Sequence, residues 1–214
     1  MSKTDEERDS EILDQAARML EQTAEYQKLV EKLKPLVETI QSSSEKVGEF
    51  REFIKPLQTR FEKSGQRMLL FKEDSKADYD SRLNTLRKAF SFLALFETSV
   101  ANILNCMVIL LILNGHDFFI QYTRKYAKSL DDLDDSFGVA EKLDFLNFHG
   151  FSFLTENINK SLRNKIAHMD FDIEEKGVVI VEKQRYDLRT EIVKLEAVLL
   201  LATRALKNSG FASL

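Results

Sequence analysis

The first third of the chain places apolar residues at alternating steps of three and four, which is the spacing of a coiled-coil seam. One series advances by seven residues and consists of Ile12, Met19, Tyr26, Leu33, Ile40, Val47, Ile54 and Phe61. A second series lies between its members and consists of Leu29, Leu36, Phe50 and Leu57, with the polar Ser43 as the one interruption. The pattern predicts a coiled-coil-like helical extension over residues 1–64.

The form of this extension stays open. Pro35 and Pro56 interrupt the pattern, and a proline inside a helix costs about 3 kcal/mol. Ser42 is followed three residues later by Glu45, the spacing of a helix N-cap with its capping box. Both one kinked helix and two successive helices satisfy these residues. The apolar seam fits packing within the chain as well as packing between chains.

The remaining two thirds predict an all-α helical bundle. Residues 65–81 break the heptad pattern and are expected to form a linker, and residues 82–214 are expected to form the bundle. Its helices are predicted near residues 82–114, 117–130, 137–148, 152–169 and 188–208. The stretch FDIEEKGVVIV alternates around Gly177 and predicts one small β-hairpin. Two histidines, His116 and His149, stand at expected helix ends, where capping or loop roles are favoured.

Composition narrows the class of protein. Seven glycines and two prolines in 214 residues are too few for the turns of a sandwich or barrel. A net charge of −4 excludes a strongly basic protein that coats nucleic acid. The polar N-terminus is unlike a secretory signal, and the apolar run 106–113 is too short to span a bilayer. The single Cys106 lies in that run and is expected to be buried, so we expect a cytoplasmic protein without membrane contact.

The segment around residues 154–171 carries the most informative chemistry. On a helical wheel, one side gathers the apolar residues Leu154, Ile158, Leu162, Ile166 and Met169. Lys160, Arg163, Asn164 and His168 fall on the other side. Asn164 precedes His168 by four residues, which favours an amide that orients the imidazole. The set combines fixed cations with a group that titrates near neutral pH.

These residue types suit metal-free cleavage of RNA. The reaction needs a base for the 2′-hydroxyl, an acid for the leaving 5′-oxygen and a cation on the phosphate. His168 fits the role of acid or base, Arg163 fits the phosphate, Asn164 orients and Lys160 supports. One histidine cannot act as acid and base at once, so we expect two chains to share one cleft. No metal-ligand cluster is recognisable, and neither a metal nor another cofactor is expected.

The stretch RNKIAH, residues 163–168, resembles the signature of the HEPN superfamily, in which arginine, a polar residue and a later histidine recur on one helix. The resemblance covers about residues 82–208 and implies an α-helical bundle that is often dimeric. Many members are metal-independent ribonucleases of toxin–antitoxin or defence systems, and an antitoxin or other protein partner is implied. HEPN helices often carry an acidic residue that faces the motif. Glu97 fits that place, or else it is a packing carboxylate paired with an arginine.

The sequence is therefore compatible with two functions. The first is a metal-independent endoribonuclease with a site shared across a homodimer. The second is a non-catalytic RNA-binding or protein-interaction scaffold built on a HEPN-like dimer. Because Arg163, Asn164 and His168 are all present, the sequence favours the enzyme.

Overall fold

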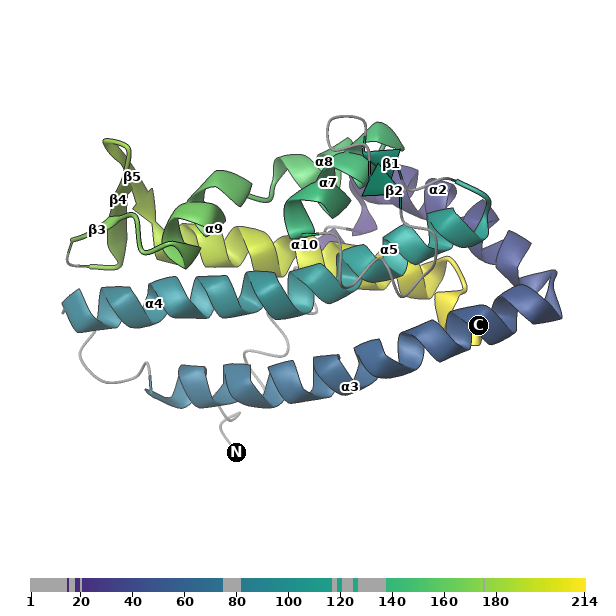
Figure 1. Ribbon diagram of the computed structural model, residues 1–214, viewed down its shortest axis with the longest axis horizontal. Helices are drawn as coiled ribbons and strands as arrows, with labels where there is room; N and C mark the ends of the chain where they lie inside the picture. Colours follow the sequence, from purple (N-terminus) through teal and green to yellow (C-terminus); the bar gives the residue numbers. More distant parts are fainter. Residues whose placement is uncertain are drawn as a thin grey trace.

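The protein is mostly helical, with a small sheet at one end. The computed structural model describes residues 15, 18–19, 21–74, 82–116, 119–120, 125–126, 138–174 and 176–214. Figure 1 shows an elongated bundle in which α4, α5 and α10 run along the long axis and α3 lies beside them. The β3–β5 sheet lies at the end of the bundle where α4 begins.

The N-terminal region forms two successive helices, α2 (Ala24–Gln41) and α3 (Ser44–Asp74). Ser43 caps α3, and its Oγ accepts from the Lys46 amide at 3.3 Å, whereas Ser42, the expected N-cap, is the C-cap of α2. Pro35 and Pro56 both lie inside helices. The capping chemistry of the serines, more than the prolines, therefore sets the break between the two helices.

The apolar seam within α2 and α3 packs within its own chain, whereas Met19, a seam residue before α2, is 66% exposed. Six seam residues are at most 3% exposed: Tyr26, Leu29, Leu33, Ile40, Phe50 and Leu57. They belong to one core that includes α4, α5 and α10, and Asn208 Nδ2 of α10 donates to Tyr26 Oη at 2.5 Å. Two helices that share the core of the bundle do not form a separate extension. Ile12 lies outside the described residues.

The expected linker over residues 65–81 is helical over residues 65–74, where it forms the last part of α3, which ends at Asp74. Residues 66–72 are glutamine, arginine, methionine, leucine, phenylalanine and lysine, which mostly favour helix. Residues 75–81 lie outside the described residues.

A long central helix follows the predicted bounds. It consists of α4 (Arg82–Leu95), a π-helical turn η1 (Phe96–Val100) and α5 (Ala101–Leu113). Cys106 is buried in it, and Gly115 follows its end with a φ of 86°. Among the described residues, Arg82–Leu113 is long and apolar enough to cross a membrane, but 72% of its apolar window is buried inside the fold. It therefore serves as the core helix of the bundle.

Two predicted helices need correction. The segment expected as a helix over 117–130 contains the short antiparallel strands β1 (Phe119–Ile120) and β2 (Lys125–Tyr126), in agreement with its aromatic and β-branched residues. The helix expected over 152–169 is two helices, α8 (Ser152–Glu156) and α9 (Lys160–Ala167). The preceding α7 (Val139–Phe148) agrees with the prediction.

The sheet near Gly177 has one strand more than the predicted hairpin. β3 (Asp172–Ile173), β4 (Val178–Val181) and β5 (Gln184–Asp187) pair antiparallel in that order. Gly177 adopts a φ of 80°, and its amide donates to the buried Thr85 Oγ1 at 3.0 Å. This bond attaches the sheet to the beginning of α4. The last long helix, α10 (Leu188–Asn208), has the predicted bounds, and a short 3-10 turn η2 (Phe211–Ser213) follows it.

Candidate active site

The short helix α9 carries the RNKIAH motif, and hydrogen bonds define both of its ends. At the start, Asn159 Oδ1 accepts from the Leu162 amide at 3.0 Å. At the end, the amides of Met169 and Asp170 donate to the carbonyls of Ile166 and Lys165, at 3.1 and 2.8 Å. This is a Schellman motif, with Met169 at the left-handed position that glycine usually fills.

This ending decides where the last residues of the motif lie. Met169 has a φ of 58° and is 58% exposed, so its expected place in the core is wrong. The helix has ended before Met169 and the chain has already turned away from the core. Leu154, Ile158, Leu162 and Ile166 are buried as predicted. His168 is the C-cap residue and is exposed.

Arg163 is held by residues from two helices. Its Nε and Nη2 atoms contact Glu97 Oε1, and its Nη1 atom donates to Asn164 Oδ1 at 2.8 Å. The guanidinium carbon also lies 5.9 Å from the centre of the Phe96 ring, within cation–π range. Glu97 and Phe96 belong to the π-helical turn, a feature that is frequent at functional sites. Arg163 is therefore fixed in position and remains 26% exposed at its side chain.

The amide of Asn164 serves Arg163, whereas the sequence predicted that it would orient His168. The link between Asn164 and His168 is a backbone bond, from the His168 amide to the Asn164 carbonyl at 3.0 Å. Within the described part of the chain, the His168 imidazole has no hydrogen bond or ion pair, but it lies near Asp170, whose pKa is lowered first by Lys165 and then by the charge of His168. The residue is exposed to solvent.

Carboxylates compensate the cations of α9. Lys160 Nζ lies 2.7 Å from Asp144 Oδ1, and Lys165 Nζ lies 2.6 Å from Asp170 Oδ2 and 2.8 Å from Glu182 Oε1. The hydrogen bonds that Lys165 donates, first to Asp170 and then to Glu182, raise the pKa of Lys165. The bond to Lys165 is also the largest cause that lowers the pKa of Asp170. Each of the three cations of α9 thus has a carboxylate partner.

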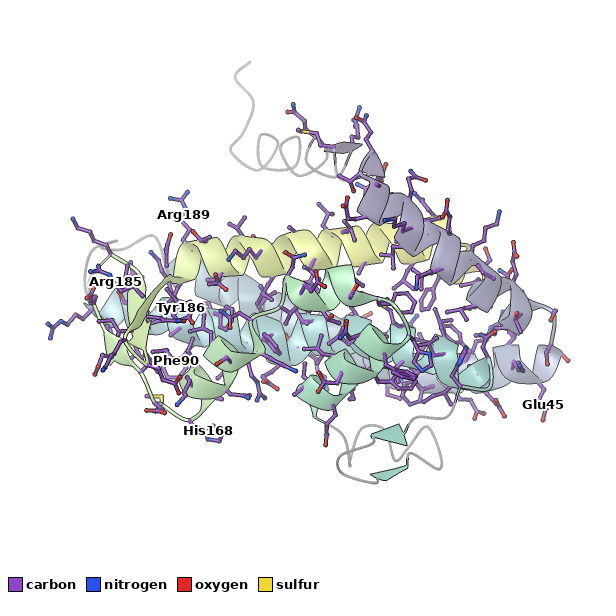
Figure 2. The ribbon with its side chains drawn as sticks, turned by 90° about the horizontal axis from the view of Figure 1, so that it is seen from above. Glu45, Phe90, His168, Arg185, Tyr186 and Arg189 are labelled. Atoms are coloured by element: carbon purple, nitrogen blue, oxygen red, sulfur yellow. The ribbon has the colours of Figure 1, made fainter. Side chains whose placement is uncertain are left out.

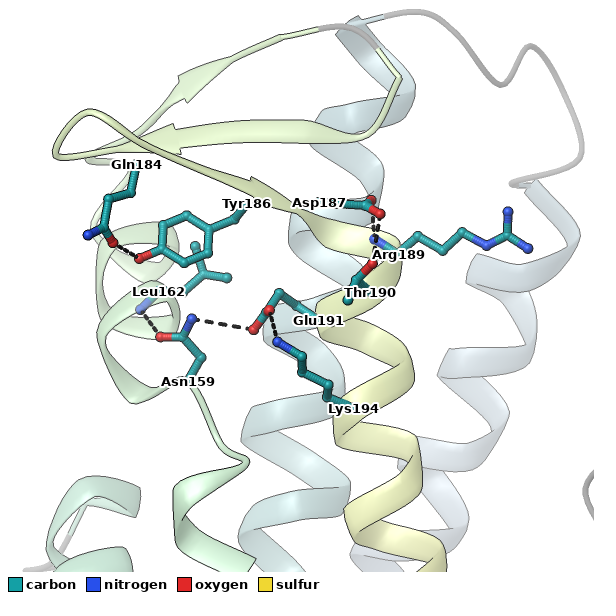
Figure 3. A network of polar contacts seen from close by, with 9 residues as sticks. All are labelled: Asn159, Leu162, Gln184, Tyr186, Asp187, Arg189, Thr190, Glu191 and Lys194. Carbon is teal, nitrogen blue, oxygen red and sulfur yellow. Dashed lines mark hydrogen bonds and ion pairs between the residues drawn. The ribbon is translucent and has the colours of Figure 1, made fainter. Parts of the chain in front are cut away.

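A polar network fixes the start of α9 against α10 (Figure 3). Asn159 Nδ2 donates to Glu191 Oε2 at 3.3 Å, and Lys194 Nζ donates to Glu191 Oε1 at 2.7 Å. Glu191 is only 7% exposed, so its carboxylate depends on these donors. The position of the motif helix is therefore tied to the longest helix of the C-terminal half.

In the structure Arg163 contacts both Glu97 and Asn164. His168 is the C-cap of α9, the helix that carries Arg163 and Asn164. Lys160 instead faces Asp144. Sequence reasoning missed Lys165 and Asn159, although the N-cap preference of asparagine was a usable signal for the latter. Among the described residues, no group of three or more His, Cys, Asp or Glu side chains has a metal-binding arrangement. The chain matches no family model, no curated protein and no solved structure at a significant level.

Proposed function

We propose that this chain is a metal-independent endoribonuclease of the HEPN type, acting in the cytoplasm as a homodimer with a shared site. One observation supports it most: a fixed arginine lies on a short helix, and an exposed histidine is the C-cap of that helix. Arg163 is held by Glu97 and Asn164, and His168 has no hydrogen-bond partner among the described residues. A fixed cation and an exposed imidazole are what cleavage of RNA without a metal needs.

The reaction would run with two histidines. A neutral His168 accepts the proton of the 2′-hydroxyl, and the resulting oxygen attacks the adjacent phosphorus. The bond from phosphorus to the 5′-oxygen breaks, and a protonated His168 of the partner subunit donates a proton to that oxygen. The products are a 2′,3′-cyclic phosphate and a 5′-hydroxyl, and the two histidines end in exchanged protonation states.

Arg163 retains donors for the phosphate. A guanidinium has five N–H groups. Glu97 contacts one N–H on Nε and one on Nη2, and Asn164 accepts from one N–H on Nη1. The second hydrogens of Nη1 and Nη2 remain for the phosphate oxygens as negative charge develops there. Glu97 accordingly has a positioning role in this proposal.

A second candidate is a non-catalytic RNA-binding or protein-interaction scaffold. The observation in its favour is that all three cations of α9 already contact carboxylates. An antitoxin or other protein partner, implied by the resemblance to HEPN proteins, would cover the same exposed edge under either candidate.

The test is cleavage of a single-stranded RNA in EDTA. We expect products with 2′,3′-cyclic ends, a bell-shaped pH–rate profile and no cleavage of DNA, which lacks the 2′-hydroxyl. His168→Ala should abolish turnover, whereas the matched control His116→Ala should not, because exposed His116 lies beyond the far end of α5. Activity that requires magnesium or survives in His168→Ala contradicts the mechanism.

A further inference from the structure

We propose that Phe90 is a stacking platform for a nucleobase of single-stranded RNA beside the cleaved phosphate. This inference rests on the proposed function and names the form of RNA that the site takes. Phe90 lies on α4, outside the motif, and is 38% exposed, whereas Phe92 and Phe96 of the same long helix are buried. An exposed aromatic ring needs an explanation when it lies next to a candidate site.

The relative direction of α4 and α9 places Phe90 opposite His168. The beginning of α4 is fixed by Thr85, which bonds Gly177 after the motif. The region just after α4 is fixed by Glu97, which bonds Arg163 inside the motif. The two segments therefore run antiparallel, as Figure 1 also shows.

Helix dimensions then set the level of each residue. Phe90 precedes Glu97 by seven residues, about 10.5 Å along the axis at 1.5 Å per residue. His168 follows Arg163 by five residues, about 7.5 Å in the same direction. Figure 2 shows Phe90 and His168 at the same end of the molecule, and α4 packs against α9. Met169, exposed beside His168, extends the apolar surface there.

The electrostatics of α9 favour stacking as a source of affinity. Because Lys160, Arg163 and Lys165 are paired with carboxylates, phosphate contacts alone are weaker than on a basic surface. An aromatic side chain contributes affinity for each base that it stacks, whatever the base. Stacking on Phe90 requires a base that is free of its neighbours, so the site should prefer single strands and loops over duplex RNA.

The test uses the full chain with His168→Ala, so that RNA is bound without being cut. The probe is a short single-stranded RNA with 2-aminopurine, a base whose fluorescence falls when it stacks. We expect Phe90→Leu to weaken binding by roughly tenfold and to abolish the quenching, and Phe90→Trp to restore both. Leucine retains an apolar, helix-compatible side chain, so the fold should persist.

The control is Phe148→Leu, because Phe148 is an 85% exposed phenylalanine at the C-terminal end of α7, where its ring contacts His149. It should change neither affinity nor quenching. Equal quenching with and without Phe90 overturns the inference. The inference also fails if Phe90→Leu changes only the mass of the dimer in sedimentation, because Phe90 would then be a contact between two copies of the chain. Failure of the His168→Ala chain to bind RNA contradicts both proposals. If quenching depends on Phe90 but the wild-type protein does not cleave RNA, only the proposal that the protein is a ribonuclease is contradicted.

Discussion

Replacing Asn159 with alanine should destabilise the protein by about 2 kcal/mol. The change removes the N-cap of α9, where Asn159 Oδ1 accepts from the Leu162 amide, an effect of about 1 kcal/mol. It also removes the bond to the buried Glu191 carboxylate, which contributes about another 1 kcal/mol because Lys194 still engages that carboxylate. For a domain of this length the melting temperature should fall by roughly 4–8 °C.

Asn159→Ser separates the two contributions. Serine is an N-cap as good as asparagine, but its short side chain does not carry the amide donor that reaches Glu191. We therefore expect about half of the alanine effect. The assay is urea unfolding followed by far-UV circular dichroism, combined with amide hydrogen exchange of Leu162, which should lose protection in Asn159→Ala and retain it in Asn159→Ser.

The reasoning fails if Asn159→Ala is as stable as the wild type. It also fails if serine and alanine destabilise equally and expose the Leu162 amide alike, because the cap would then contribute nothing. Since α9 has eight residues, loss of its cap should also lower any RNA-cleaving activity through the position of Arg163.

Two further predictions concern titratable groups outside the motif. Burial first, and then the charges of His116 and Lys32, lowers the pKa of His149 below the ordinary value of 6.5. The unfolded chain therefore binds a proton more readily than the folded one, so the free energy of unfolding should fall as pH drops below about 6.5. This dependence should be weaker in His149→Gln, and an unchanged pH profile would contradict it. Burial also raises the pKa of the Cys106 thiol to about 12, so a thiol reagent at mildly alkaline pH should label Cys106 only after denaturation. Rapid labelling of the native protein would contradict its place in the core.

The helices with regular apolar periodicity could be predicted from the sequence. The bounds of α10 and of the central helix agree with the pattern because each buries a continuous apolar face. The break between α8 and α9 could not be predicted, because apolar periodicity continues across it. Leu154, Ile158, Leu162 and Ile166 keep a four-residue step across the break, so the pattern reads as one helix.

Other features had no local signal. The π-helical turn changes the register of the central helix, and the sequence of residues 96–100 contains no feature that predicts it. The end of α9 was missed because Met169 occupies a position where glycine would have marked the end of the helix. The third strand β5 is largely exposed and polar, so it lacks the alternation that predicted β4.

The candidate site could be predicted in part. The sequence identified Arg163, Asn164 and His168, and it offered the contact between Glu97 and an arginine as one of two alternatives. It assigned Asn164 to His168, because a four-residue spacing suggests contact on a helix. The structure shows that Asn164 bonds Arg163 and that His168 lies at the end of the helix. Pairings between residues of different elements, such as Glu182 with Lys165 or Asp144 with Lys160, depend on the fold and have no signature in the sequence.

The most direct test of the central proposal is cleavage by mixed dimers. Wild-type and His168→Ala chains are unfolded together, refolded in equal amounts and assayed on a single-stranded RNA in EDTA. If each site needs His168 from both chains, only wild-type pairs are active, and about a quarter of the activity of an all-wild-type sample remains. Retention of about half of the activity would mean that each chain acts alone, and would contradict the shared site.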